Sequence, residues 1–267
     1  MTPGHVIFIG AGPGAADLIT LRGAQRLASA DVVLYDALTD PAFKHFAPQA
    51  TWVDVGKRGF CDSTGQATID ALLVRHALAG RVVVRLKGGD PSIFGRLEEE
   101  LLALAAHHIT SEVVPGVTAA IAAAADVQRP LTRRGSGRSV TLSTAMTREG
   151  QLQVNPTGAR HADTEVFYMA GRQLGKLARQ LRAAGWLADT PVLVVSHAGL
   201  PDRVSSDHAL VDLAAASVRH AGRPTVVTVG AGAKPVVATS ANQPTVAASP
   251  CMALLAAPEP CGAKSAL

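Results

Sequence analysis

The sequence predicts an α/β protein with two successive α/β domains. At 267 residues the chain is long enough for a substantial core and for one or two domains. Short β-branched runs alternate with helical patterns, which indicates right-handed crossovers and a largely parallel sheet. Pro115-Gly116 interrupts this alternation, and a second α/β series begins near Ser139. We therefore expect an N-terminal domain over residues 1–116 and a C-terminal domain over residues 117–235.

The first series contains five expected strands with helices between them. The strands are short apolar runs, at residues 5–9, 31–35, 51–55, 81–86 and 112–114. Helices are expected at residues 17–28, 66–79 and 93–106, the second of which carries Ile69, Leu73 and other apolar residues at helical spacing.

The second series opens with a small-residue helix over residues 117–125. Its expected strands lie at residues 139–143, 165–169, 191–196 and 225–229, with a helix at 174–184. Residues 147–163 are polar and contain glycine and proline, which is typical of a long loop. Residues 236–267 are rich in Ala, Pro, Ser and Thr without periodicity, so we expect a poorly ordered tail there.

Composition and charge narrow the function classes. The net charge of +4 is too small for a nucleic-acid footprint, and aromatic residues are not interleaved with the basic ones. Three scattered cysteines have no metal-type spacing, which favours a reduced, cytoplasmic protein without a bound metal. We expect a soluble protein, because no signal-like region opens the chain and no apolar stretch approaches the roughly 20 residues of a membrane helix.

Two glycine-rich turns predict a ligand cleft. The strand at 81–86 ends at Gly88-Gly89, where the missing Cβ atoms allow a ligand to lie against the backbone, and Asp90-Pro91 is expected to open the next helix. The segment Gly10 to Gly14 follows an earlier strand in the same way. In an open α/β sheet, such strand ends bind small molecules.

A dinucleotide site is an alternative interpretation of the first turn. Gly10, Gly12 and Ala15 fit the relaxed Rossmann fingerprint, and acidic residues follow about 20 positions later. Pro13 weakens this reading because it removes a backbone donor at the expected entry to the phosphate-binding helix.

Several longer blocks occur in one order between residue 5 and about residue 230. They are Gly10 to Gly14, Leu18 to Ala24, Ala30 to Asp36, Gly56-Lys57-Arg58, Gln66, Arg85 to Arg96, Val114 to Ala120, Pro130 to Arg134, Tyr168-Met169 and Asp189 to Val192. In this order the blocks resemble the tetrapyrrole methyltransferase family, and Lys87 to Arg96 is most similar to its uroporphyrinogen-III C-methyltransferase branch. The resemblance implies the two-domain tetrapyrrole methylase (class III methyltransferase) fold, with a cleft for S-adenosylmethionine between the domains, and a homodimer.

The resemblance also implies roles for individual residues. As catalytic residues it implies Asp36 as proton acceptor and Lys57 as proton donor, with no metal. Arginine forks pair carboxylates, so Arg58, Arg96, Arg133 and Arg134 are the candidates for binding a polycarboxylate substrate. The implied cofactor contacts are Pro13, Gly88, Gly89, Asp90, Ile93, Thr118, Ala119, Met169 and Ala198.

The expected reaction is transfer of two methyl groups to uroporphyrinogen III, giving precorrin-2 for sirohaem or cobalamin synthesis. Departures from the family pattern concern the substrate: Ser92 stands where relatives usually have Phe, Leu97-Glu98 where they have Gly-Gly, and Ala145-Met146 where they have Gly-His. A methyltransferase for a later precorrin is therefore an alternative. An NAD-dependent reductase and a catalytically silent binding protein are the alternatives from other classes.

Overall fold

The computed structural model describes residues 4–36, 39–56, 65–145 and 162–236. The segment Met1–Val236 forms one compact unit. The expected loop at 147–163 lies almost entirely outside the described residues, and so does the expected tail beyond Val236.

The first sheet is entirely parallel, as the sequence predicts. Its strand order is β3-β2-β4-β1-β5, and every recorded pairing between neighbours is parallel. The strands are β1 (His5–Gly10), β2 (Val32–Tyr35), β3 (Thr51–Asp54), β4 (Val82–Lys87) and β5 (Thr110–Val114). Because β1 lies directly beside β4, the two glycine-rich turns leave neighbouring strands at the same edge of the sheet.

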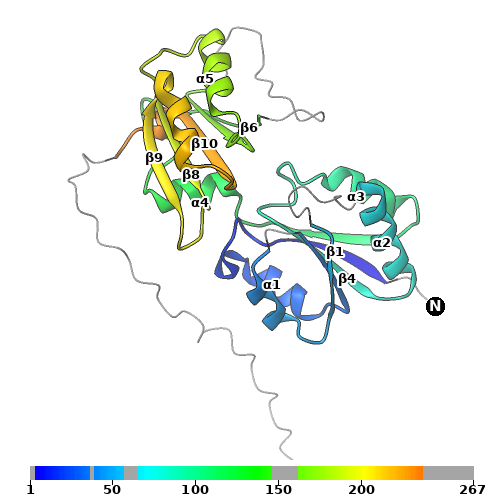
Figure 1. Cartoon of the computed structure of the whole chain (residues 1–267). Coiled ribbons are helices and arrows are strands. Elements are labelled where there is room, and N and C mark those ends of the chain that lie inside the picture. The colour runs from blue at the N-terminus through cyan, green and yellow to red at the C-terminus, as the bar shows by residue number, and fades with distance from the viewer. Residues whose placement is uncertain (1–3, 37–38, 57–64, 146–161, 237–267) are drawn as a thin grey trace, which may run out of the picture. The chain divides into compact units, whose positions relative to one another are not determined.

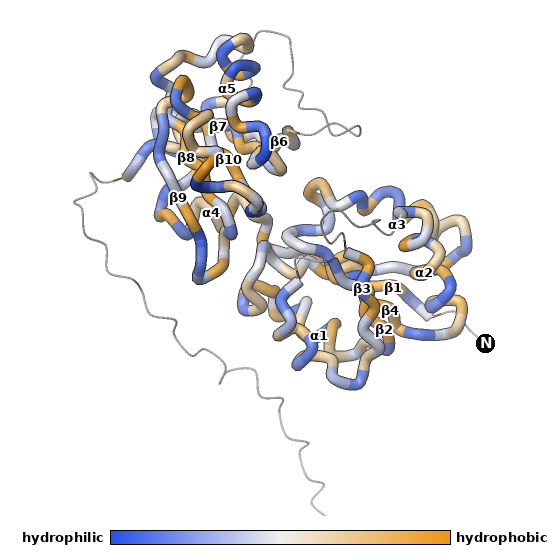
Figure 2. The backbone as a smooth tube through the Cα atoms, viewed as in Figure 1, coloured by the Kyte–Doolittle hydropathy of each residue, from blue (hydrophilic) through white to orange (hydrophobic). Residues whose placement is uncertain are grey.

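Helices cover both faces of this sheet (Figure 1). They are α1 (Leu21–Ala28), α2 (Gln66–Leu78) and α3 (Leu97–Ala105), with short 3-10 helices η1 (Ala16–Leu18) and η2 (Pro41–Phe46). Phe8 of β1 packs in one cluster with α2 and α3, whereas Ile7 packs in another with α1 and η2. Successive side chains of a strand point to opposite faces, so apolar residues run without a break over residues 6–9 of β1 and 82–84 of β4 (Figure 2), before Arg85 and Lys87 follow in β4.

Two expected helices begin later than the sequence pattern suggests. The helix expected from residue 93 starts at Leu97, because Arg96 has a φ of 55° and lies in the left-handed region. Residues 91–95 form turns, so Asp90-Pro91 opens a turn and not a helix. The helix expected from residue 17 starts at Leu21, where the Thr20 hydroxyl accepts a hydrogen bond from the Gly23 amide at 3.1 Å.

The second sheet is mixed, and our expectation of a largely parallel arrangement is wrong here. Its order is β6-β7-β10-β8-β9, and only β6 and β7 are parallel. The strands are β6 (Val140–Thr144), β7 (Thr164–Tyr168), β8 (Pro191–Ser196), β9 (Val204–Ala209) and β10 (Thr225–Gly230). The sequence analysis did not predict β9, because its segment VSSDHA has little apolar character. Residues 197–203 are also too few for a parallel crossover, which needs roughly a dozen residues.

Helices cover both faces of the second sheet as well. They are α4 (Ala119–Asp126), α5 (Leu174–Ala183) and α6 (Ala216–Arg219), with 3-10 helices η3 (Leu210–Ala215) and η4 (Ala231–Ala233). Helix α4 packs in one cluster with Leu193 and Val195 of β8, while α5 and η3 pack in another with Val194. The domain boundary at residues 116 and 117 stays a prediction.

Candidate active site

The two glycine-rich turns lie against each other. Gly89 donates its amide to the Gly12 carbonyl at 2.7 Å, and Gly12 donates to the Gly89 carbonyl at 3.2 Å. Ala11 donates to the Lys87 carbonyl at 2.8 Å. The reciprocal bonds between Gly12 and Gly89 form an isolated antiparallel bridge just beyond the parallel strands β1 and β4, so the two turns are held together at one edge.

A third backbone segment, Pro115-Gly116 after β5, completes this edge. A Cβ atom at Gly116 would lie 2.4 Å from the Gly89 carbonyl oxygen, so only glycine permits the approach. The Asp90 carboxylate accepts from the Gly116 amide at 2.9 Å and from the Ser92 amide at 2.8 Å. Asp90 therefore fixes two loops and does not cap a helix.

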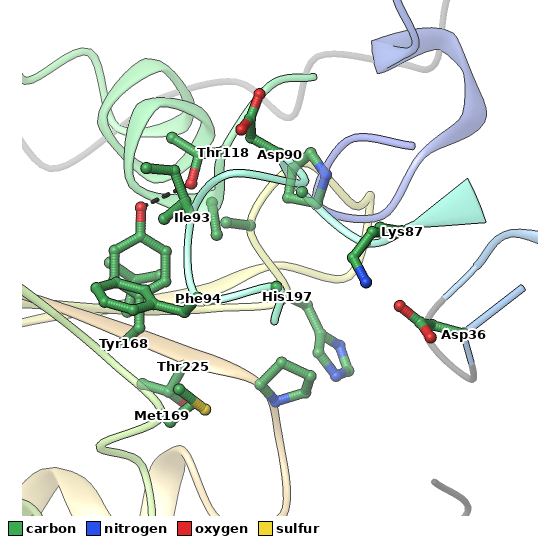
Figure 3. Close-up of a pocket in the computed structure, with 18 of the residues that line it drawn as sticks. Asp36, Lys87, Asp90, Ile93, Phe94, Thr118, Tyr168, Met169, His197 and Thr225 are labelled. Carbon is green, nitrogen blue, oxygen red and sulfur yellow. Dashed lines mark hydrogen bonds between the residues drawn. The ribbon is translucent and has the colours of Figure 1, made fainter. Parts of the chain in front are cut away.

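A cavity of about 410 Å³ opens at this edge (Figure 3). This volume lies in the range of small-molecule sites. Asp36, the predicted proton acceptor, lines the cavity. So do all the residues predicted to contact the cofactor, namely Pro13, Gly88, Gly89, Asp90, Ile93, Thr118, Ala119, Met169 and Ala198.

The second sheet contributes a wall of the cavity that the sequence reading largely missed. Strand β10 runs antiparallel between β7 and β8, so its amino end lies beside their carboxyl ends. This brings Pro224, Thr225 and Val226 to the cavity with Tyr168, His197 and Leu200. The Tyr168 hydroxyl lies 2.7 Å from that of Thr118, and it accepts from the Ala120 amide at 3.3 Å. Burial raises the pKa of Tyr168, so this group is a neutral phenol.

Strained backbone and exposed apolar side chains gather at the cavity. Phe94, Met169 and His197 line it with φ values of 52°, 59° and 53°. Such values are uncommon outside glycine and cluster at functional sites. Phe94 and Met169 are 42% and 53% exposed, and the Phe94 ring lies 5.1 Å from the Tyr168 ring, edge to face. A ligand in the cavity would cover this apolar surface.

Charged side chains meet at one end of the cavity, where the strands β2 and β4 end. Arg85 donates from Nη2 to Asp36 Oδ1 at 2.7 Å and from Nε to Glu100 Oε1 at 3.0 Å. Lys87 donates to Glu100 Oε2 at 2.6 Å. Arg85, Lys87 and Glu100 are buried, whereas the Asp36 side chain is 33% exposed. The sequence analysis assigned no role to Lys87, which lines the cavity, or to Glu100, which binds Lys87 and Arg85.

The environment shifts the two cations in opposite directions. Burial acts to lower the pKa of Arg85, but the carboxylates of Asp36 and Glu100 outweigh it, so the pKa lies above its ordinary value. Burial and the Arg85 charge lower the pKa of Lys87, although Glu100 acts against them. Arg85 is therefore the permanent partner of Asp36, and Lys87 is the cation that loses its proton more readily.

The predicted substrate arginines are not brought to the cavity among the described residues. Arg96 pairs with Glu99 at 2.6 Å on the surface, and Arg134 is exposed. Arg133 donates to the backbone carbonyls of Ala231 and Lys234, so its guanidinium holds η4 in place. Arg58 and the predicted proton donor Lys57 lie outside the described residues.

The described part of the chain has neither a metal cluster nor a membrane-spanning helix. No group of three or more His, Cys, Asp or Glu residues there could hold a metal ion. No helix there is both long and apolar enough to cross a membrane. A Rossmann phosphate site would also need a helix that begins at the first glycine turn, whereas α1 begins only at Leu21.

A one-way chain of hydrogen bonds leads from the cavity wall into the second sheet. The Thr225 hydroxyl donates its hydrogen bond to the Arg223 carbonyl at 2.9 Å. It must therefore accept the hydrogen bond that it shares with the Ser196 hydroxyl at 2.8 Å. Ser196 in turn accepts from His220 Nδ1 at 2.7 Å. This order makes neutral His220 the Nδ1–H tautomer, and its Nε2 accepts from Ser206 at 2.8 Å.

Acid should therefore destabilise the protein through His220. Burial, with smaller effects from Arg219, His208 and Arg223, lowers the pKa of His220 from 6.5 to about 4. Below pH 6.5 the His220 side chain is protonated in the unfolded chain, whereas in the folded chain it stays neutral until about pH 4. We expect the free energy of unfolding to fall by at most about 3 kcal/mol across this window and to be fully retained above it.

Urea unfolding between pH 7.5 and pH 4.5 measures this effect. The His220→Gln variant should show a shallower pH dependence, whereas His45→Gln, at an exposed histidine, should match the wild type. An unchanged pH dependence in the His220 variant would contradict the assignment.

Comparison with known proteins shows which family this chain resembles. Residues 5–214 match the family described as Tetrapyrrole (Corrin/Porphyrin) Methylases. The chain is 42% identical over 239 residues to a uroporphyrinogen-III C-methyltransferase from Pseudomonas aeruginosa, covering 88% of this chain and 96% of that protein. It is 43% identical over 213 residues to a siroheme synthase from Neisseria meningitidis, covering 79% of this chain but only 44% of that protein.

A solved structure supports the same placement. The uroporphyrin-III C-methyl transferase of Thermus thermophilus, complexed with S-adenyl homocysteine, has a TM-score of 0.74 and 36% identity, and the match covers 85% of this chain and 97% of that one. The expected two-domain α/β class is thereby confirmed. On these matches, the chain belongs to the tetrapyrrole (corrin/porphyrin) methylases.

Proposed function

We propose that this chain uses S-adenosylmethionine to methylate uroporphyrinogen III twice on carbon, giving precorrin-2 for sirohaem or cobalamin synthesis. The observation that carries the proposal is the single cavity that contains Asp36 and every residue predicted to contact the cofactor. The 42% identity to a relative named uroporphyrinogen-III C-methyltransferase, over nearly the whole of both chains, supports this substrate.

The cavity fits the methyl donor on physical grounds. A Cβ atom placed on Gly88 would have no neighbour within 4 Å, so bare backbone faces open space there. The adenosyl group can lie against that backbone, while Phe94, Tyr168 and Met169 offer apolar contacts. We propose the predicted cofactor residues as its contacts, with Asp90 holding the turn in shape.

Once bound, the sulfonium supplies an electrophilic methyl group to an electron-rich pyrrole carbon. The cavity walls orient the donor, and alignment of the reacting atoms accounts for much of the acceleration in such a transfer. The ring carbon gains a methyl group and the ring system then loses one proton. We propose that the Asp36 carboxylate accepts this proton. We propose further that Lys57 donates a proton at one ring position only as the ring releases another, so that each transfer still removes one proton in net terms.

The carboxylates of the substrate need cations, and the described arginines do not supply them at the cavity. We retain Arg58 as a proposed substrate contact, because it follows Gly56-Lys57 in the same sequence block. Ser92 is exposed and lies outside the cavity lining, so its departure from the family pattern leaves the proposed cofactor contacts intact.

Two further proposals rest on the family alone. By likeness to the family we propose a homodimer located in the cytoplasm. The chain spans less than half of the siroheme synthases that it matches, so any activity of the rest of those proteins is not part of this proposal.

The test is incubation with S-adenosylmethionine and uroporphyrinogen III without oxygen, followed by mass spectrometry. We expect a product heavier by two CH2 units and S-adenosylhomocysteine in twofold amount. A later precorrin is the second candidate, because a cobalt precorrin-4 methyltransferase has a TM-score of 0.76 to this chain at 30% identity. Turnover of a later precorrin alone would favour that candidate, and no methyl transfer to either would overturn both.

A further inference from the structure

A fully buried glutamate on α3 connects the charged groups at the cavity. Glu100 has no exposed surface, lies outside the cavity lining, and binds two cations at once. Its Oε1 accepts from Arg85 and its Oε2 accepts from Lys87. Gln66 of α2 adds a hydrogen bond to Oε1 at 3.3 Å and also donates to Asp70 at 2.8 Å.

The two cations lead from Glu100 to the reaction space. Arg85 of β4 donates to Oδ1 of Asp36, which directly follows the neighbouring strand β2, and it also donates to the Leu86 carbonyl at 3.2 Å. Its guanidinium therefore has little freedom to turn. The Lys87 amine points toward the Asp36 carboxylate in the cavity wall (Figure 3). Asp36 Oδ2 has no hydrogen-bond partner in the part of the chain that the structure describes, and it is left to accept a proton.

We propose that Glu100 is a positioning residue for proton transfer: it fixes Arg85, which orients Asp36, and it fixes Lys87 beside Asp36. This inference rests on the proposed function. In each transfer the S–CH3 bond breaks with its electron pair left on sulfur, and a C–CH3 bond forms on the ring. The ring then releases one proton, which Asp36 Oδ2 accepts, and solvent removes it afterwards.

Charge balance explains why a buried carboxylate is needed there. Arg85 and Lys87 carry two positive charges, and Asp36 and Glu100 carry two negative ones. A buried cation without its partner is costly, so loss of Glu100 would drive Arg85 and Lys87 to share Asp36. Asp36 would then be turned and its free oxygen occupied.

The Glu100→Gln variant tests the inference. It keeps the size of the side chain and an acceptor for Arg85, but it removes the charge and places a donor against Lys87. We expect kcat to fall on the order of tenfold to a hundredfold, with KM and Kd for S-adenosylmethionine within about twofold of wild type. Because a negative charge is lost beside the reacting groups, the pH profile of kcat should move to lower pH, which a purely structural role would not cause.

A double-mutant cycle with Asp36→Asn gives the second readout. If Glu100 acts through Asp36, the loss in the double variant should be close to that of Asp36→Asn alone. Glu112→Gln is the matched control, because it makes the same change in an exposed ion pair with Arg26 and should leave kcat unchanged. If Glu100→Gln folds poorly, Arg85→Lys serves as the second variant. It keeps the positive charge but removes the planar guanidinium that binds Asp36 and Glu100 at once, so it should reproduce the loss in kcat.

The wild type is assayed in parallel. If wild type makes no methylated product, the proposed function fails and this inference fails with it. If wild type is active and Glu100→Gln matches it in kcat and pH profile, or the two losses simply multiply in the double variant, the inference alone is overturned.

Discussion

A Gly88→Val variant is expected to fold normally and to lose most of its affinity for S-adenosylmethionine. A Cβ atom at this position meets no protein atom within 4 Å, and the Gly88 backbone does not require a positive φ. The new side chain therefore costs the fold little but occupies the space beside the backbone where the adenosyl group is proposed to lie. A clash of about 3 kcal/mol would weaken binding on the order of a hundredfold.

Calorimetric titration with S-adenosylhomocysteine, together with thermal unfolding, measures both parts of this expectation. Ser92→Val is the control, because it places the same side chain in the same turn at an exposed position outside the cavity lining. It should bind like the wild type. Wild-type affinity in the Gly88 variant would show that the ligand lies elsewhere.

An Asp36→Asn variant should bind the methyl donor normally, and its rate of methyl transfer should fall by a factor of about 10² to 10⁴. The amide oxygen of asparagine can still accept the hydrogen bond from Arg85 that Asp36 Oδ1 accepts at 2.7 Å, so the local geometry can be kept. What is lost is the basic oxygen that accepts the ring proton. Single-turnover measurement of methylated product, beside the Kd for S-adenosylhomocysteine, separates the two effects.

The control for this substitution is Asp17→Asn. Asp17 is exposed on η1, and the variant removes the same charge without touching the cavity lining. Its rate should equal that of the wild type. If the Asp36 variant turns over at the wild-type rate, Asp36 has no part in proton transfer.

The structure explains why the glycine-turn residues of the cavity could be predicted from the sequence. Gly88, Gly89 and Asp90 follow a parallel strand, and the carboxyl ends of adjacent parallel strands meet at one edge. A local pattern of an apolar run followed by glycines therefore predicted both the strand and the cavity that its end lines. The roles of Lys57 and Arg58 stay predictions, since these residues lie outside the described part of the chain.

Other site residues gave no local signal. Pro224 and Thr225 stand at the amino end of β10, where a parallel sheet would place them far from the carboxyl ends of its neighbours. They reach the cavity only because β10 is antiparallel to β7 and β8. Strand direction is decided by which strands pair across the sheet, and the residues of β10 alone do not encode it.

Most strands and helices and the two glycine turns could be predicted from the residues alone, because each depends on residues close together in the chain, although β9 could not. The alternation of strands and helices was enough to predict a parallel first sheet. The folded structure was needed to show that Glu100 binds two cations, Arg85 and Lys87, and that Arg133 binds the backbone at η4 and does not line the cavity. An ionic side chain can find its partner anywhere along the chain. Its role therefore follows from packing that brings distant segments together, and no local pattern records it.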